Sequence, residues 1–209
     1  MTRNVGIYIF DEIEVLDLGG PFEVFSTASR MKAKLNPGAA KPFEVFTIAE
    51  TIRPIQACGG LMIQPAFDIT NHPAIDVLIV PGGVVTAELE RPAIIEWISR
   101  MATKSELTAS VCTGAFLLAK AGLLHGKTIT THWEDIADFR TMFPGIIVRD
   151  DVRWIDDGKI ITSAGISAGL DMSLHLVARL EDEELAIRTA RQMDYQWQRS
   201  HRECVGNRL

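Results

Sequence analysis

The chain has little cysteine, no long apolar run and no excess of positive charge. Its 209 residues include only three cysteines, Cys58, Cys112 and Cys204, which make no disulfide framework. The formal net charge is −6, so nothing suggests a surface for nucleic acid. No apolar run approaches the roughly 18 residues of a membrane span, and the first apolar segment is too short for a secretion signal. These absences predict a cytoplasmic protein that binds neither nucleic acid nor membranes.

Short apolar runs alternate with helical segments along the chain. The apolar runs predict strands at Val5–Phe10, Phe43–Ala49, Asp76–Val80, Leu107–Val111, Lys127–Thr131, Val152–Ile155 and Lys159–Thr162. The intervening patterns predict helices from about Gly20, with Pro21 at the first position, and at Pro92–Thr103, Thr113–Ala121, Ile136–Met142, Ser167–Leu180 and Glu183–Gln196. Ser29–Pro42 has the composition of an exposed loop, and Ile52–Gln64 that of a hairpin turning at Gly59-Gly60.

This alternation predicts an α/β fold with one doubly wound, mostly parallel sheet flanked by helices. A single domain is expected over residues 1–209, with its core at about 4–182 and a C-terminal helix and tail at about 183–209. Ligands of such sheets bind beyond the carboxyl ends of the strands. Cys112, Gly82-Gly83 and the segment after Phe10 all follow predicted strands, so we expect a site where they meet.

Cys112 stands between an apolar strand and a helix that begins at Thr113. This position is typical of a nucleophile elbow, and Gly114 and Ala115 leave room for its tight turn. Unpaired N–H groups at a helix N-terminus favour thiolate, which predicts a pKa of roughly 3.5–7.5 instead of about 8.5. The alternative is that Cys112 is a small, unreactive residue of the core.

Three further residues qualify as partners of the thiol. Asp17 precedes the first predicted helix, where it is an N-cap or first-turn acid, or a carboxylate that exchanges protons with Cys112, and both roles can hold together. Gly82 and Gly83 either form a plain turn or offer N–H groups to a developing negative charge, with the Thr113 N–H as a second donor.

Two other polar side chains stand near this predicted site. The Thr113 hydroxyl either orients a water or substrate or merely starts its helix. His132 follows a strand and is the best of the five histidines for a base, although a histidine at such a position is commonly structural. No spacing of His, Cys and Asp makes a credible metal site.

The chain resembles the ThiJ/PfpI superfamily, with its flavodoxin-like, class I glutamine amidotransferase-like fold. The resemblance covers roughly Val5 to Leu180. It depends on five motifs in order: Leu16-Asp17-Leu18-Gly19-Gly20-Pro21, Val80-Pro81-Gly82-Gly83, Ser110-Val111-Cys112-Thr113-Gly114, Thr130-Thr131-His132-Trp133 and Thr162-Ser163-Ala164-Gly165-Ile166-Ser167-Ala168-Gly169-Leu170-Asp171. The third and fourth are similar to the branch that holds isonitrile hydratase and the sensor domains of AraC-type regulators. Protease-like members place histidine directly after the cysteine, where this chain has Thr113.

The resemblance implies that water adds to an isonitrile, R–N≡C, to give an N-substituted formamide. Cys112 would then be the nucleophile, Asp17 the proton relay, and Thr113 a group that positions the adduct. Gly82, Gly83, Gly20, His132 and Ser163 would line the site as oxyanion or substrate-binding residues. The resemblance also implies a small-molecule substrate, a homodimer, and neither a metal nor an organic cofactor.

Two alternatives remain open on the same fold. One is a non-enzymatic module that senses a ligand or the redox state through oxidation of Cys112. The other is a glyoxalase or deglycase that acts on 2-oxoaldehydes. Ser29–Pro42 and the C-terminus, Asp194–Arg199, depart from the hydratase pattern, which leaves the substrate open. A chain that ends at Leu209 is not expected to be a complete AraC-type regulator.

Overall fold

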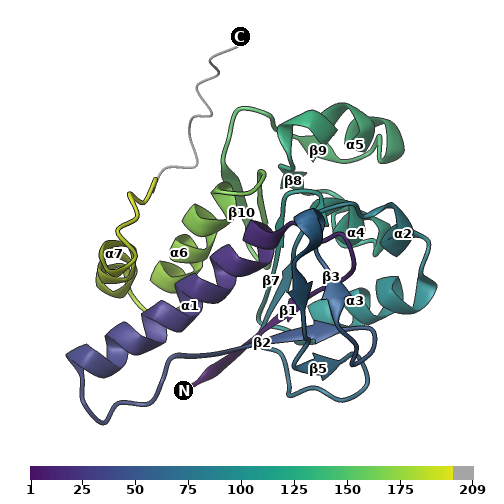
Figure 1. The fold of residues 1–209 in the computed structure, drawn as a ribbon. Helices are drawn as coiled ribbons and strands as arrows, with labels where there is room; N and C mark the ends of the chain where they lie inside the picture. The colour runs from purple at the N-terminus through teal and green to yellow at the C-terminus, as the bar shows by residue number, and fades with distance from the viewer. Residues whose placement is uncertain (200–209) are drawn as a thin grey trace.

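A seven-stranded sheet forms the centre of the molecule (Figure 1). The computed structural model describes residues 1–199. The strands lie in the order β10-β11-β7-β6-β1-β2-β5, and every pair is parallel except β10 with β11. Their bounds are β1 Arg3–Tyr8, β2 Phe43–Ala49, β5 Phe67–Asp68, β6 Val77–Val80, β7 Leu107–Val111, β10 Trp154–Asp157 and β11 Ile160–Ser163. The predicted α/β fold with a mostly parallel sheet is therefore confirmed.

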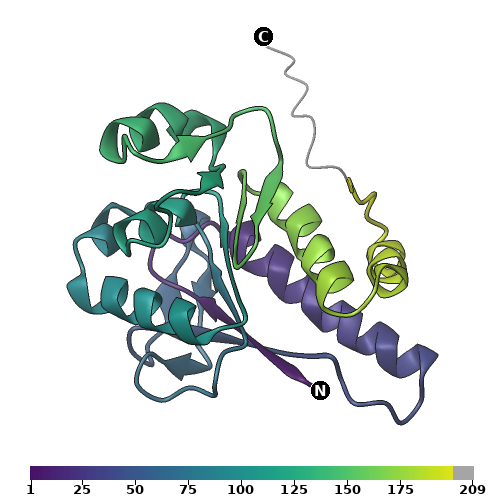
Figure 2. The same ribbon diagram turned by 180° about the vertical axis from the view of Figure 1, so that it is seen from behind.

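Helices cover both faces of this sheet, as the two opposite views show (Figures 1 and 2). One layer consists of α1 Val15–Leu35, α6 Ala168–Leu180 and α7 Glu183–Gln192, which pack on one another. The other consists of α2 Thr86–Leu89, α3 Pro92–Lys104 and α4 Gly114–Lys120. Both central strands β6 and β7 are buried along their whole length, because helices enclose them on either side.

Smaller elements lie outside the two layers. Strands β3 Ile55–Gln56 and β4 Met62–Ile63 form the predicted hairpin, with the 3-10 turn Cys58–Gly60 between them. Strands β8 Thr128–Ile129 and β9 Ile147–Val148 pair beside α5 Ile136–Met142, which follows the 3-10 turn Trp133–Asp135. No helix within residues 1–199 is long and apolar enough to cross a membrane.

The first helix corrects two predictions. It begins at Val15 rather than near Gly20, so Pro21 lies inside the helix and Asp17 lies in its first turn. It also runs through Leu35, so only the second part of the predicted loop Ser29–Pro42 is irregular. Packing of α1 on β2, α6 and α7 stabilises a helix whose Gly-Gly-Pro sequence disfavours one locally.

Other boundaries differ less. The last helix ends at Gln192, short of the predicted Gln196, and the short elements β5, α2 and β9 were not predicted. Two to four residues carry too little periodicity to be recognised. Cys204 lies outside the described residues.

The connections place the carboxyl ends of β1, β6 and β7 side by side. The chain leaves β1 for its neighbour β2 on one side and later returns to β6 on the other. The crevice at such a change of direction is where open α/β sheets bind ligands. The first turn of α1, which follows β1, carries Asp17, and the turns that follow β6 and β7 carry Gly82 and Cys112.

Candidate active site

Cys112 occupies the sharp turn between β7 and α4. Its φ of 56° is left-handed, which is strained for any residue with a side chain. Neighbouring backbone holds the turn: the Cys112 N–H donates to the carbonyls of Ser163 at 3.2 Å and Ala164 at 3.3 Å. The Cys112 carbonyl accepts a 2.8 Å hydrogen bond from Thr131 Oγ1. The predicted elbow is therefore present, and its cysteine is 7% exposed.

Two glycines let the rest of the backbone approach the elbow. A Cβ on Gly114 would lie 2.0 Å from the Val80 carbonyl oxygen. A Cβ on Gly82 would lie 2.6 Å from the Thr113 nitrogen and 2.9 Å from Cys112 Cβ. Only glycine fits at either position, because backbone atoms cannot move aside as a flexible side chain can.

Asp17 is fully buried, and its carboxyl group faces the elbow. Oδ2 accepts a 3.1 Å hydrogen bond from the Gly82 N–H, whereas Oδ1 has no hydrogen bond of normal geometry to residues 1–199. Burial raises the pKa of Asp17 to about 7, against the lowering effects of the Gly82 N–H and weaker interactions with the Cys112 thiol and the Ile166 N–H. The N-cap of α1 is Glu14, so Asp17 is not the helix cap, but it is the acidic residue of the first turn, which the sequence also predicts.

Cys112 does not have the lowered pKa that its position predicts. Burial and the negative charge of Asp17 raise the pKa of the thiol, and they outweigh the N–H and hydroxyl of Thr113, which lower it. Two adjacent acids in a dry site cannot both ionise cheaply, so the pair keeps at least one proton through neutral pH. Near pH 7 that proton resides on sulfur whenever Asp17 is ionised.

The Thr113 hydroxyl forms two hydrogen bonds with the backbone of Gly83. Oγ1 donates to the Gly83 carbonyl and accepts from the Gly83 N–H, both at 2.8 Å. The Gly82 N–H likewise donates a hydrogen bond to the Asp17 carboxyl. The two glycine N–H groups predicted to stabilise a substrate's negative charge therefore already have partners, and they fix Asp17 and Thr113 instead. Of the two Thr113 groups that act on the sulfur, the N–H has the larger effect.

Replacing Thr113 with valine is expected to destabilise the protein by about 1–3 kcal/mol, because both polar groups of Gly83 lose their partner at once. Thr113→Ser keeps the hydroxyl and serves as the matched control, with a melting temperature close to that of the wild type. Denaturant unfolding of the two variants measures the difference. Equal stability of the valine and serine variants would show that this pair of hydrogen bonds contributes nothing.

The remaining predicted site residues have partners or neighbours other than the thiol. His132 Nδ1 pairs with Asp135 Oδ2 at 3.1 Å, and the imidazole packs so closely on Gly165 that a Cβ there would lie 2.0 Å from its Cδ2. Ser163 donates its hydroxyl to the Ser110 carbonyl at 3.3 Å, so only its own carbonyl reaches Cys112. Gly20 faces Leu170 of α6, where a Cβ would come within 3.3 Å, and thus serves helix packing.

One neighbour of Asp17, Ile166, is not predicted from the sequence. Ile166 has a left-handed φ of 51°, and its N–H interacts with the Asp17 carboxyl. The residue lies in the last of the five motifs, but a branched side chain gives no signal for such a conformation. No group of three His, Cys, Asp or Glu side chains within residues 1–199 is arranged to hold a metal ion.

The open parallel sheet and the buried cysteine elbow beside a carboxyl group define the class: a flavodoxin-like α/β protein with its site at the strand ends. The family model "DJ-1/PfpI family" matches residues 3–179, and the chain belongs to that family.

Individual relatives differ in what they do. The chain is 31% identical to the isonitrile hydratase of Pseudomonas putida over 93% of its own length and 79% of the relative's. It is 29% identical to the HTH-type transcriptional regulator GbdR of Pseudomonas aeruginosa over 88% of its length, but it spans only 48% of that protein.

Among solved structures, a ThiJ/PfpI family protein from Pseudomonas syringae superposes with a TM-score of 0.82 at 26% identity, covering 95% of this chain and 77% of the other. Drosophila melanogaster DJ-1beta superposes with a TM-score of 0.78 at 18% identity, covering 94% of this chain and 100% of the other, and shows the shared fold.

Proposed function

We propose that this protein is a hydratase that adds water to small isonitriles through Cys112 and needs no cofactor. The observation that carries the proposal is the buried Asp17 carboxyl beside the thiol, with a pKa of about 7, while His132 is paired with Asp135. A base with a pKa near the working pH exchanges protons most effectively. The 31% identity to an isonitrile hydratase supports the same reaction.

In the first step the Cys112 sulfur attacks the terminal carbon of R–N≡C. Because burial keeps the thiol protonated, ionised Asp17 removes its proton as the S–C bond forms and passes that proton to the same carbon. The product is a thioimidate, R–N=CH–S–Cys112. The Thr113 N–H at the start of α4 stabilises the negative charge on sulfur while the proton is in transit.

In the second step water adds to the thioimidate carbon. Asp17, ionised again, takes a proton from the water as the C–O bond forms, and the nitrogen gains a proton. The tetrahedral adduct R–NH–CH(OH)–S–Cys112 then expels the sulfur, which recovers its proton, and releases R–NH–CHO. The sum is one isonitrile plus one water giving one formamide, with no change of oxidation state.

Purified protein is expected to convert a panel of aliphatic and aromatic isonitriles to formamides, and Cys112→Ala is expected to abolish the conversion. Chromatography with mass detection of the formamide measures the rate against a protein-free blank. Methylglyoxal added to the same panel tests the glyoxalase alternative by lactate formation. Absence of formamide from every isonitrile would remove the hydratase proposal.

A sensing module is the second candidate, because the chain is also 29–31% identical to transcriptional regulators, of which it spans about half. This candidate predicts a tight complex with a small molecule, or selective oxidation of Cys112, without turnover. The homodimer remains a prediction, which sedimentation or light scattering of the purified protein decides.

A further inference from the structure

A pocket of about 290 Å³ opens beside the elbow, and its walls are continuous with the proposed catalytic groups. Two lining residues contact the backbone of Cys112, and a third contacts the Asp17 carboxyl. Thr131 donates its hydroxyl to the Cys112 carbonyl, Ala164 accepts from the Cys112 N–H, and the Ile166 N–H interacts with Asp17. Cys112, Asp17 and Thr113 do not line the pocket themselves, so a molecule that reaches both Cys112 and Arg153 passes along Ala164 and Ile166.

Arg153 supplies the cation of the pocket. Its side chain is only 16% exposed, and its guanidinium is held by the fully buried Asp171 carboxylate, through Nε at 2.7 Å and Nη2 at 2.6 Å. Nη2 also donates to Ser167 Oγ at 3.3 Å, and the Tyr195 hydroxyl interacts with both Arg153 and Asp171. A carboxylate behind an arginine fixes its planar fork, so the guanidinium that lines the pocket meets an anion in a fixed orientation.

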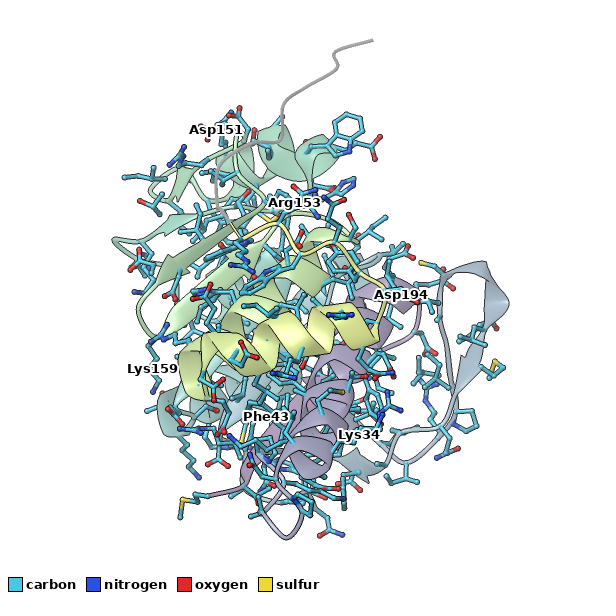
Figure 3. The ribbon with its side chains drawn as sticks, turned by 90° about the vertical axis from the view of Figure 1, so that its left-hand side faces the viewer. Lys34, Phe43, Asp151, Arg153, Lys159 and Asp194 are labelled. Atoms are coloured by element: carbon cyan, nitrogen blue, oxygen red, sulfur yellow. The ribbon has the colours of Figure 1, made fainter. Side chains whose placement is uncertain are left out.

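The segment after α7 donates two hydrogen bonds to Asp171. The Gln198 N–H donates to Asp171 Oδ1 at 2.9 Å, and Trp197 Nε1 donates to the Asp171 carbonyl at 3.2 Å. Figure 3 shows Arg153 beside the stretch that leaves Asp194. With Asp171 anchored by backbone and indole donors, the guanidinium is positioned before any ligand arrives, which reduces the entropy lost on binding.

The other titratable groups that line the pocket have partners outside it. Asp150 pairs with Arg140 at 3.5 Å, and His132 pairs with Asp135 at 3.1 Å. The 13-residue helix α6 begins at the pocket wall with Ala168, so its positive end also faces this space. Ile136 and Val152 add apolar side chains to the lining. The pocket thus suits a short apolar chain that ends in an anion.

We propose that Arg153 binds the carboxylate of the substrate, so that the preferred substrates are isonitriles that carry a carboxylate at the far end of a short alkyl chain. This inference rests on the proposed hydratase function and names its substrate class. Hydration would then release N-formyl amino acids. Arg153 acts in recognition, since it is separated from the reacting carbon by the length of the substrate.

The test compares ω-isocyano carboxylates of increasing chain length with their methyl esters. The wild type is expected to show a higher kcat/KM for the acid than for its ester, with an optimum at one chain length. Arg153→Gln is expected to lower kcat/KM for that acid by about 10- to 100-fold, through KM, and to leave the ester within about twofold. Arg153→Gln alone leaves Asp171 as an unpaired buried charge and can impair folding. The double variant Arg153→Gln/Asp171→Asn removes both buried charges, and it is expected to show the same selective loss for the acid.

Arg149→Gln is the matched control, because Arg149 lies nearby in the chain but binds the exposed Asp151 at 2.5 Å. It is expected to leave both substrates unchanged. Equal activity of wild type on acid and ester, or equal loss of both in the Arg153 variants, overturns the carboxylate subsite.

Calorimetric binding of ω-formamido carboxylates, the products, separates this inference from the reaction itself. Binding that depends on Arg153 without any isonitrile turnover supports the subsite and removes the hydratase. Turnover of isonitriles without such binding supports the hydratase and removes the subsite.

Discussion

Asp17→Asn is expected to lower isonitrile turnover by about a thousandfold and at the same time to make the protein more stable at pH 8. The loss of rate follows because asparagine can neither take the thiol proton nor activate water, and general acid–base catalysis contributes about 10²–10⁴-fold. In the wild type, kcat/KM should fall as the pH drops through about 7, where Asp17 becomes protonated.

The gain in stability follows from the same raised pKa. In the unfolded chain Asp17 ionises near the ordinary aspartate pKa of 3.8, whereas in the folded chain its pKa is about 7. The raised pKa therefore does not change the free energy of unfolding below pH 3.8. Between pH 3.8 and 7 only the unfolded chain is ionised, so the free energy of unfolding falls progressively, and above pH 7 the full loss is about 4 kcal/mol. Asparagine avoids this cost, so the two melting temperatures should diverge as the pH rises from 4 to 8.

Asp11→Asn is the matched control, since Arg53 lowers the pKa of this exposed carboxyl. Its effect on stability should be small and of the opposite sign. Thermal unfolding of the three proteins across this pH range makes the comparison. A variant Asp17→Asn that is less stable than the wild type at pH 8 would mean that the folded protein favours the ionised carboxylate.

Gly114→Ala is expected to destabilise the protein by about 3 kcal/mol or more. The new Cβ would lie 2.0 Å from the Val80 carbonyl oxygen and 2.8 Å from that of Pro81, so α4 must move away from the end of β6. The Gly82 contact with Asp17 lies directly beyond that strand end, and activity should therefore fall as well.

Gly19→Ala makes the same chemical change inside α1, where no neighbouring atom lies within 4 Å of the added Cβ. It is expected to stabilise the helix by up to about 1 kcal/mol and to leave turnover unchanged. Urea unfolding of both variants gives the two values. Equal effects from the two substitutions would contradict the close approach of α4 to β6.

The elbow was predictable because it depends on local sequence. An apolar strand, a cysteine and small residues before a helix leave few other conformations, and the alternation of strands and helices places Cys112 and Asp17 at the same edge of the sheet. The start of α1 was not predictable from Gly19-Gly20-Pro21, since packing against β2, α6 and α7 overrides the local preference.

The electrostatics of the site required the three-dimensional structure. A cysteine at a helix N-terminus predicts a lowered pKa, but burial and the Asp17 charge reverse the direction. The partners of the Gly82 and Gly83 N–H groups are side chains distant in sequence, at positions 17 and 113. Arg153 and Asp171 are likewise 18 residues apart, and nothing in their spacing indicates a buried pair.

Mass spectrometry of the protein during turnover tests the central claim most directly, namely that Cys112 adds to the isonitrile with a proton relayed by Asp17. We expect the wild type to gain the full mass of one isonitrile on the peptide that contains Cys112. In water enriched in heavy oxygen, the adduct should decay to a formamide that carries one heavy oxygen atom. Asp17→Asn should accumulate neither adduct nor product. Formamide produced at an undiminished rate by Cys112→Ala, with no adduct on the wild type, would contradict the account.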